Sequence, residues 1–447
     1  MPPAQSVLLP VDILWKIAFL IGDVEDLIDF LEALGPCDLL GPLAHLYELF
    51  TTHHHSELWP RLRLNRSILD SSERHLYEKI VKYYGHIVVD DVWEDMAWLQ
   101  RYLNPMAQIA WNLQDIDIPL TSIRLDDWAE FKIFHLAVDL RDDHDAIWCT
   151  VALSELPSLT CLEANISCYD LDAFFANVAA SKQITQLHLS FDEYQLTAFD
   201  LVHLTEWLRH QPVCQFGCEL GDWEDLDFDV KEGFYHAMFN CPTLHVLELS
   251  SCELDDIDFT EFDFPMKSLV LHQCSLASEQ VQALVSRLET SKITRLQLTD
   301  FTFDHMEGIE SLLEIQPKTP MTHLALSGLH MDEAAWSKLA PLIEKCTLET
   351  LVFYATQFSS NVTQSLATAI QNNQTLCELD LNYTEMAISD VELLIQSMNH
   401  PSRHTKAIRI KWTSHYERIY DPEALQALKA LIALAVNGGG EFVYEED

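Results

Sequence analysis

Three consecutive histidines, His53, His54 and His55, form the densest group of potential metal ligands in the chain. Adjacent side chains point in different directions on a helix or a loop, and no acid or further histidine follows at the spacing of a metal site. Cys214 and Cys218 are the closest cysteine pair, and their spacing is typical of strand residues at the edge of a core. We therefore interpret the histidines as part of a solvated loop, and we expect neither a metal nor a cofactor.

Paired carboxylates are the other residues that could do chemistry. They occur at Asp90–Asp91, Asp126–Asp127, Asp142–Asp143 and Asp255–Asp256. General acid–base catalysis needs surroundings that push two pKa values apart, and no basic or histidine partner stands at a fixed spacing from these pairs. The sequence has no Gly-x-Ser-x-Gly, Walker loop or His-Glu-x-x-His motif, and the glycines at 438–440 are typical of a turn. We predict that the protein is not an enzyme.

Composition narrows the class of partner. The 447 residues include 70 acidic and 27 basic side chains, a formal net charge of −43, and 48% are hydrophobic, enough for a core. The negative electrostatic field of such a charge repels nucleic acid and anionic membranes and favours basic protein partners. The acid concentrates in 222–232 and in 253–263, and the second segment, with six acids and no base, is expected to be irregular chain.

Cysteine usage and hydropathy indicate the compartment. The 11 cysteines include no Cys-x-x-Cys pair. No export signal precedes the first helix, and no apolar run reaches the ~20 residues that a membrane span requires. We expect reduced thiols and a cytoplasmic or nuclear protein.

A repeated sequence unit extends along the chain from Leu244 onward, and its fold positions the polar residues of this part of the chain. Its frame is apolar-x-x-Leu-x-Leu-x-x-Cys/Thr-x-apolar. The central leucines are Leu247, Leu269, Leu296, Leu324, Leu351 and Leu379, at distances of 22, 27, 28, 27 and 28 residues. A fixed period of this length indicates a stacked solenoid, because one unit cannot bury its own apolar face. Segments between the strands, such as 278–288, have helical spacing, with Ser278 as the expected N-cap.

This frame resembles the leucine-rich repeat, and a period near 28 with one helix per unit resembles the ribonuclease-inhibitor class of that family. The resemblance implies an α/β fold, an open horseshoe-shaped solenoid with parallel strands on its concave face and helices outside. Cys252 and Cys274 occupy the frame position whose side chain bonds the turn backbone. Weaker copies extend upstream, where Phe134 stands 28 residues before Leu162, and downstream to Ile410.

Side chains alternate along a strand, so the residues between the frame leucines face the concave side. Ten of them are candidate contacts for a target protein: Glu248, His272, Arg295, Gln297, His323, Tyr354, Glu378, Asp380, Arg409 and Lys411. Tyr354, Arg295 and Trp412 are the expected anchors, because Tyr, Arg and Trp dominate binding hot spots. Ala325 is expected on the same open face, so that Ala325→Ser costs little while Leu324→Ala is costly.

The chain begins differently. Leu9-Pro10-Val11-Asp12-Ile13-Leu14 opens a helix, a second helix follows Asp23 as its expected cap, and Leu58-Trp59 closes the segment. This segment resembles an F-box, which implies binding to the Skp-type adaptor of a cullin ubiquitin ligase through Leu9, Pro10, Ile13, Leu14 and Ile17. It departs from the family in the middle, where residues 35–42 and a helix at 43–50 replace a Val-Cys-x-x-Trp element. The alternative is an amphipathic cap that seals the first repeat.

These patterns divide the chain into an all-α F-box-like module (1–64), connecting chain or degenerate first repeats (65–115), leucine-rich repeats (116–421), and a C-terminal cap helix with a last strand (422–447). An F-box followed by leucine-rich repeats is similar to substrate receptors of SCF-type ubiquitin ligases. The expected role is therefore a protein-interaction adaptor in the ubiquitin conjugation pathway, monomeric outside its complex. The alternative is a stand-alone acidic scaffold or inhibitor that binds a basic protein.

Overall fold

The computed structural model describes residues 9–34, 40–192, 196–219, 226–299, 307–329, 331–384, 386–403, 409–413 and 422–444. The chain forms two compact units, Met1–Tyr194 and Gln195–Asp447. Each unit is built from parallel strands that follow one another in chain order, with helices or irregular chain between them. Within the described ranges, every helix is too short or too polar to span a bilayer.

The first unit starts with helices α1 (Val11–Ala18), α2 (Val24–Leu34), α4 (Leu43–Phe50) and α5 (His55–Leu58). The expected cap of α2 is present, because Asp23 Oδ1 accepts hydrogen bonds from the backbone N–H groups of Glu25 (2.8 Å) and Asp26 (3.2 Å). The residues at 35–39, part of the segment that departs from the F-box pattern, lie outside the described ranges.

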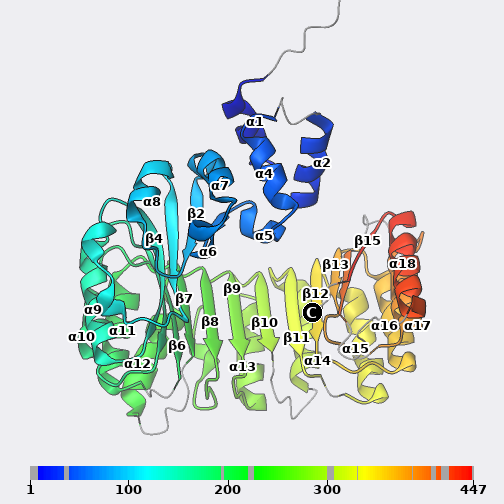
Figure 1. Cartoon of the computed structure of the whole chain (residues 1–447). Helices are drawn as coiled ribbons and strands as arrows, with labels where there is room; N and C mark the ends of the chain where they lie inside the picture. The colour runs from blue at the N-terminus through cyan, green and yellow to red at the C-terminus, as the bar shows by residue number, and fades with distance from the viewer. Residues whose placement is uncertain are drawn as a thin grey trace, which may run out of the picture. The chain divides into compact units, whose positions relative to one another are not determined.

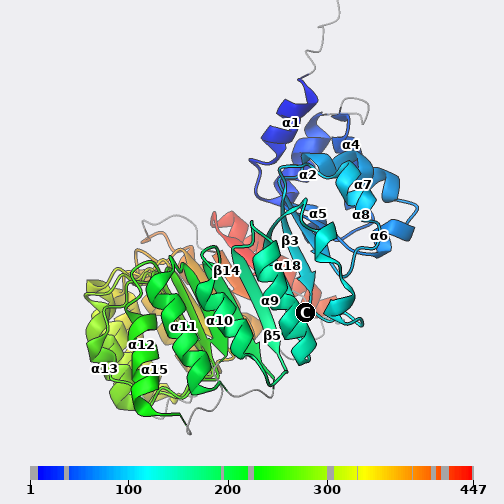
Figure 2. The same ribbon diagram turned by 90° about the vertical axis from the view of Figure 1, so that its left-hand side faces the viewer.

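The strands of the first unit are β1 (Leu62–Leu64), β2 (His86–Asp90), β3 (Gln108–Leu113), β4 (Lys132–Leu140), β5 (Cys161–Ile166) and β6 (Gln186–Phe191). Between them lie α6 (Ser67–Asp70), α7 (Arg74–Ile80), η1 (Val81–Tyr83), α8 (Met96–Tyr102), the 3₁₀ turns η2 (Leu120–Ser122) and η3 (Leu125–Asp127), α9 (Asp143–Glu155) and α10 (Asp172–Ala180). Figure 2 shows α9 and α10 side by side. Residues 65–115 thus contribute β2 and β3 to the parallel sheet.

The register of β4 differs from the one that the sequence spacing predicts. The spacing places Phe134 opposite Leu162, whereas in the structure Leu136 pairs with Leu162 and His135 pairs with Cys161. The ladder between β3 and β4 shifts at Ile109, where an irregularity interrupts the pairing. The ladder between β4 and β5 is itself regular, so the repeat that joins them is two residues shorter than the predicted 28. The predicted register of this strand is therefore wrong by two residues.

The strands of the second unit are β7 (Gln215–Glu219), β8 (Val246–Ser250), β9 (Ser268–His272), β10 (Arg295–Thr299), β11 (His323–Ser327), β12 (Thr350–Tyr354), β13 (Glu378–Asp380), β14 (Arg409–Trp412) and β15 (Glu441–Tyr444). Between and after them lie α11 (Ala198–His210), α12 (Phe228–Phe239), η4 (Phe259–Glu261), α13 (Ser278–Leu288), α14 (Glu307–Ile315), η5 (Gln316–Lys318), α15 (Glu333–Lys345), α16 (Ser360–Asn372), α17 (Ile388–Met398) and α18 (Pro422–Asn437). Figure 1 shows β8 to β12 running side by side.

The predicted register of the second unit is confirmed. The frame leucines from Leu247 to Leu379 are direct neighbours across β8 to β13, and Ile410 and Phe442 continue the row. The short repeat at 253–263 forms only the 3₁₀ turn η4, as its length predicts. One detail was wrong: Ser278 is the first residue of α13, and Ala277 is its N-cap.

Cysteines close the turns after two strands, as the frame predicts. Cys252 Sγ donates to the Ser250 carbonyl oxygen at 3.0 Å, and Cys274 Sγ to the His272 carbonyl oxygen at 3.4 Å. Both side chains are buried. They satisfy turn carbonyls that would otherwise lose hydrogen bonds on burial, and they are structural.

Burial corrects the expectation for Ala325. Leu324 points into the core and is 0% exposed, and Ala325 pairs with Gln297 and Val352 on the opposite face of the sheet. Ala325 is nevertheless also 0% exposed. A methyl group flanked by longer side chains is covered by them even on an open sheet, so Ala325 is not an exposed position and Ala325→Ser is not expected to be harmless.

We predict that Leu324→Ala lowers the free energy of unfolding by roughly 2–5 kcal/mol, because apolar burial is lost and a cavity remains. The control is Gln297→Ala, at a partly exposed position on the opposite face of β10, which should change it by less than about 0.5 kcal/mol. Urea unfolding of both variants measures the contrast. Equal destabilisation would contradict the assignment of the two faces.

Candidate protein-interaction surfaces

The ten predicted contact residues lie together on one face of β8 to β14, and we call this set the strand-face strip. The ladder places Arg295 beside His323, Glu378 beside Arg409, and Asp380 beside Lys411. The strip is thus assembled as the alternation of side chains predicts. Its role in binding a partner stays a prediction.

Charges at the C-terminal end of the strip are paired with one another. Lys411 Nζ lies 2.8 Å from Glu378 Oε1, and Arg409 Nε lies 2.8 Å from Glu441 Oε2. The hydrogen bond to Glu378 raises the pKa of Lys411. Asp380 is only 6% exposed, and its Oδ1 accepts the backbone N–H of Asn382 at 3.0 Å. These groups therefore stabilise the sheet and offer a partner little net charge.

The middle of the strip has an exposed arginine and an aromatic part. Arg295 is exposed, and Val352 is buried between its neighbours. The rings of Tyr354 and Tyr383 stack, with centroids 6.3 Å apart and planes at 30°. Trp412 was predicted to be an anchor, but it is 3% exposed because it points inward in the row after Ile410, so that prediction is wrong.

The two histidines of the strip have different surroundings. His272 Nδ1 lies 2.8 Å from Thr299 Oγ1 in a hydrogen bond across β9 and β10. Burial, with a smaller contribution from the charge of Arg295, lowers the pKa of His323 to about 4. His323 is therefore a neutral imidazole at physiological pH and does not add to the charge of Arg295.

We predict an acid-sensitive contribution to stability from His323. In the unfolded chain this histidine takes up its proton near the ordinary pKa of about 6.5. In the folded protein it takes up the proton only near pH 4. Stability is therefore present above about pH 6.5 and is lost as the pH falls toward 4, because the unfolded state binds the extra proton. His323→Gln should lose less stability than the native chain between pH 7 and 5, measured by urea midpoints. Gln297→Ala, which changes no titratable group, is the control, and a constant difference at all pH values would contradict the prediction.

The acidic segment 253–263 exposes its acids and buries its apolar residues. Its six acids are all exposed, while Ile257, Phe259 and Phe262 are buried. Basic residues of neighbouring elements face three of the acids: Lys231 lies 3.7 Å from Asp256, Arg287 lies 3.1 Å from Asp263, and the His236 ring lies 3.5 Å from Glu261. The segment is thus partly neutralised within the protein. Residues 222–225 of the other acidic segment lie outside the described ranges.

Glu232, His236 and Glu261 form the single group in the described residues whose metal-ligand atoms all lie within 4.8 Å of one another. Asn240 determines the histidine tautomer: its Oδ1 accepts the Asp263 N–H (2.8 Å), so its Nδ2 donates to His236 Nδ1 (3.3 Å). Nε2 then carries the proton and has no lone pair for a metal. The arrangement favours a polar contact between neutral His236 and Glu261 over a metal site.

The histidine triplet has local structural contacts. His53 Nε2 lies 2.8 Å from Glu73 Oε2, and this hydrogen bond lowers the pKa of the Glu73 carboxyl. His54 caps α5 by accepting the Ser56 N–H, and His55 Nε2 lies 3.2 Å from the Phe50 carbonyl oxygen. The three rings thus serve different contacts and do not converge on one point.

Helix α1 is apolar on two faces. Leu14 (4% exposed), Trp15 and Ala18 are buried in the first unit. On the other side, Leu9 (44%), Ile13 (43%) and Leu20 (85%) are exposed. Pro10 is also exposed and Ile17 is half-buried, and we call Leu9, Pro10, Ile13, Ile17 and Leu20 the α1 stripe. Four of the five predicted adaptor residues belong to the stripe, whereas Leu14 belongs to the core.

Aromatic contacts join α1 to the first repeat. Trp15 stacks on Tyr83, with centroids 4.7 Å apart and planes at 8°. Trp59 Nε1 donates to the Ile21 carbonyl at 3.0 Å, and Tyr84 Oη donates to the Leu58 carbonyl at 2.8 Å. The helices and the first repeat thus share one core, which keeps the α1 stripe on a rigid support.

The sheet of the first unit carries a cluster that the sequence analysis missed. His135 lies opposite Cys161 across β4 and β5, and its Nε2 is 3.6 Å from Glu163 Oε2. Gln114 Nε2 donates to Glu163 Oε1 at 3.2 Å. The contact with Cys161, and then that with Glu163, raise the pKa of His135 to about 9, and the same histidine lowers the pKa of Glu163. No sequence motif signals this cluster, because its members come together through the register of β4.

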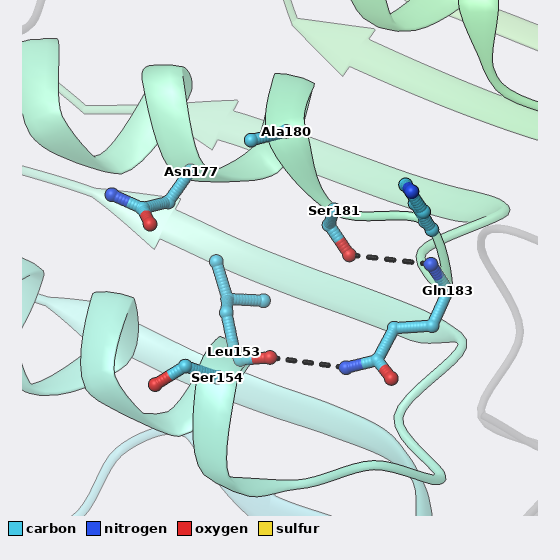
Figure 3. Close-up of a pocket in the computed structure, with 7 residues that line it drawn as sticks. Leu153, Ser154, Asn177, Ala180, Ser181 and Gln183 are labelled. Atoms are coloured by element: carbon cyan, nitrogen blue, oxygen red, sulfur yellow. Dashed lines mark hydrogen bonds between the residues drawn. The ribbon is translucent and has the colours of Figure 1, made fainter.

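A hollow of about 340 Å³ lies between the C-terminal ends of α9 and α10 (Figure 3). Gln183 Nε2 donates to the carbonyls of Leu153 (3.0 Å) and Leu156 (3.1 Å), and Ser181 Oγ accepts the Gln183 N–H (3.4 Å). These bonds satisfy carbonyls that the end of α9 leaves unpaired. The polar groups of the hollow are thus occupied in capping a helix.

The aligned leucine frame, the parallel strands and the intervening helices define a leucine-rich-repeat solenoid. No protein-family model matches the chain. A match to "NACHT, LRR and PYD domains-containing protein 14" of Mus musculus is 29% identical over 169 residues, which are 35% of this chain and 17% of that protein. The chain therefore spans much less than two thirds of that relative's length.

Two solved structures are also similar. The complex of Rad7 and Elc1 in yeast contains a chain that matches with a TM-score of 0.45 and 13% identity, over 91% of this chain and 95% of that chain. The TLR13–ssRNA13 complex matches with a TM-score of 0.35 and 15% identity, over 79% of this chain and 55% of that chain.

Proposed function

We propose that the protein is a non-catalytic interaction scaffold and, more specifically, a substrate receptor of an SCF-type ubiquitin ligase. In this proposal the α1 stripe docks a Skp-type adaptor and the strand-face strip holds a target protein. The resemblance of the first helices to an F-box supports the first contact. The open face of the repeats, with an exposed arginine and stacked tyrosines, supports the second.

The α1 stripe is the observation that carries this proposal. Water-soluble helices bury one apolar stripe and expose a polar face. Helix α1 buries Leu14, Trp15 and Ala18. Ile13 on the helix, with Leu9 before it and Leu20 after it, adds a second apolar row that is exposed. An exposed row of large apolar side chains on a rigid element is typical of a protein-binding site. A helix that served only as a cap would need only the buried row.

We predict that Ile13→Asp with Leu20→Asp abolishes adaptor binding. Both side chains are exposed, so fold stability should change little, while each buried apolar contact with the adaptor is worth about 1.5–3 kcal/mol. The loss should therefore reach about 10²-fold or more in Kd, measured by calorimetry with a purified Skp-type adaptor. The matched control is Ile147→Asp with Val151→Asp, two exposed apolar residues on α9.

The choice of positions matters for this test. Leu14→Asp would place a charge in the core and unfold the module, so its effect on binding would say nothing about docking. If the native chain does not bind the adaptor at micromolar concentration, or if the α9 control weakens binding equally, the docking assignment fails.

A stand-alone acidic scaffold that binds a basic protein is the second candidate. It is favoured by the net charge of −43 and by the six exposed acids of segment 253–263. Exposed charges separated by more than about 10 Å are screened at 0.1 M salt, so binding of this kind falls steeply with ionic strength. Target binding that is salt-sensitive and unchanged by Ile13→Asp with Leu20→Asp, in a chain without adaptor affinity, would select this candidate.

A further inference from the structure

A thiol, an imidazole and a carboxylate meet on the open sheet face of the first unit, and adaptor docking uses none of them. We propose that Cys161, His135 and Glu163 form a reactive-thiol site for a small, uncharged hydroperoxide. Cys161 is the nucleophile, His135 supplies a proton to the leaving oxygen, and Glu163 positions His135. This inference does not depend on the proposed function.

The ladder between β4 and β5 brings the three groups together. His135 is directly opposite Cys161 in this parallel ladder, so the two side chains stand next to each other on one face of the sheet. Glu163 lies two residues beyond Cys161 on the same face, and its Oε2 is 3.6 Å from His135 Nε2. The thiol is unpaired and partly exposed, and the side chains of His135 and Glu163 are 29% and 37% exposed. Small molecules can therefore reach the cluster.

Hydrogen bonding arranges the carboxylate for this role. Gln114 Nε2 donates to Glu163 Oε1, which leaves Oε2 directed to His135. The Cys161 and Glu163 side chains raise the pKa of His135 to about 9, so the ring is an imidazolium at neutral pH. The thiolate is the form of a cysteine that attacks, and an imidazolium on the opposite strand can balance its negative charge.

The reaction balances with the peroxide as the only co-reactant. The thiolate sulfur of Cys161 attacks one peroxide oxygen, an S–O bond forms and the O–O bond breaks. The leaving hydroxide takes the proton of the His135 imidazolium and departs as water. Sulfur is oxidised by two electrons to a sulfenic acid, and the peroxide is reduced by two. The leaving oxygen of a peroxide needs a proton, which the imidazolium supplies. Alkylation of the thiol would not need this proton, so the imidazolium favours a peroxide as the co-reactant.

Other thiols of the chain provide internal comparisons. Burial raises the pKa of Cys149 to about 12 and that of Cys168 to about 11, so both are poor nucleophiles. Cys377 is exposed, and its thiol donates to the Thr375 carbonyl at 3.2 Å. Cys377 is more exposed than Cys161, so accessibility alone would make Cys377 the more reactive of the two. The proposal makes Cys161 the more reactive.

The test uses the full reduced chain with hydrogen peroxide, dimedone to trap sulfenic acid, and peptide mass spectrometry to follow each cysteine. At pH 7 we expect Cys161 to be trapped well before Cys377. His135→Gln should slow trapping at Cys161 by about 10²-fold, the lower end of general acid–base effects, and leave Cys377 unchanged. An unchanged Cys377 rate and circular dichroism spectrum show that the variant is folded.

The pH profile separates chemistry from structure. The advantage of Cys161 over Cys377 should persist to about pH 9, where His135 loses its proton. Glu163→Gln removes a carboxylate that stabilises the imidazolium, so the advantage should end at a lower pH. The proposal is overturned if Cys161 reacts no faster than Cys377, or if folded His135→Gln and Glu163→Gln both keep the native pH profile.

Discussion

The central leucines of the repeats from Leu247 to Leu379 lie beside one another on successive strands, and all of them are buried. This lateral stacking is the constraint on which the rest of the unit depends. A strand buries its apolar row only if the neighbouring strand is in the same register, and a slip of one residue would turn that row outward. The same register decides which polar residues form the strand-face strip.

The two candidate surfaces rest on different kinds of support. The strip is a by-product of strand alternation, so its side chains are spread over many repeats and each pairs with its neighbours. The α1 stripe lies on helix α1 and on the residues next to its two ends. The position of the helix depends on Trp15 against Tyr83 and on the hydrogen bonds of Trp59 and Tyr84. Those contacts bury one face of α1. The exposed apolar residues of the other face are therefore not needed to pack the helix.

The acidic residues of segment 253–263 lie outside the strand-face strip, and the charged residues of the strip are largely paired. Segment 253–263 has no α-helix, and its chain alternates buried aromatic residues with exposed acids. Lys231 and Arg287, on neighbouring elements, offset part of its negative charge. On the strip, Glu378 and Glu441 neutralise Lys411 and Arg409. The strand-face strip is therefore mostly neutral, whereas segment 253–263 is acidic.

The amino-acid sequence by itself determined the repeat, its register from Leu247 to Leu379, the cap at Asp23 and the turn roles of Cys252 and Cys274, because each follows from local spacing. Only the tertiary structure decided that Ala325 and Trp412 are buried, that Leu14 lies in the core, and that His135 faces Cys161. Burial depends on neighbours from other repeats, and the partner of His135 depends on the register between β4 and β5. Periodicity assigns a side chain to a face of its strand, but the adjacent strands determine what it touches.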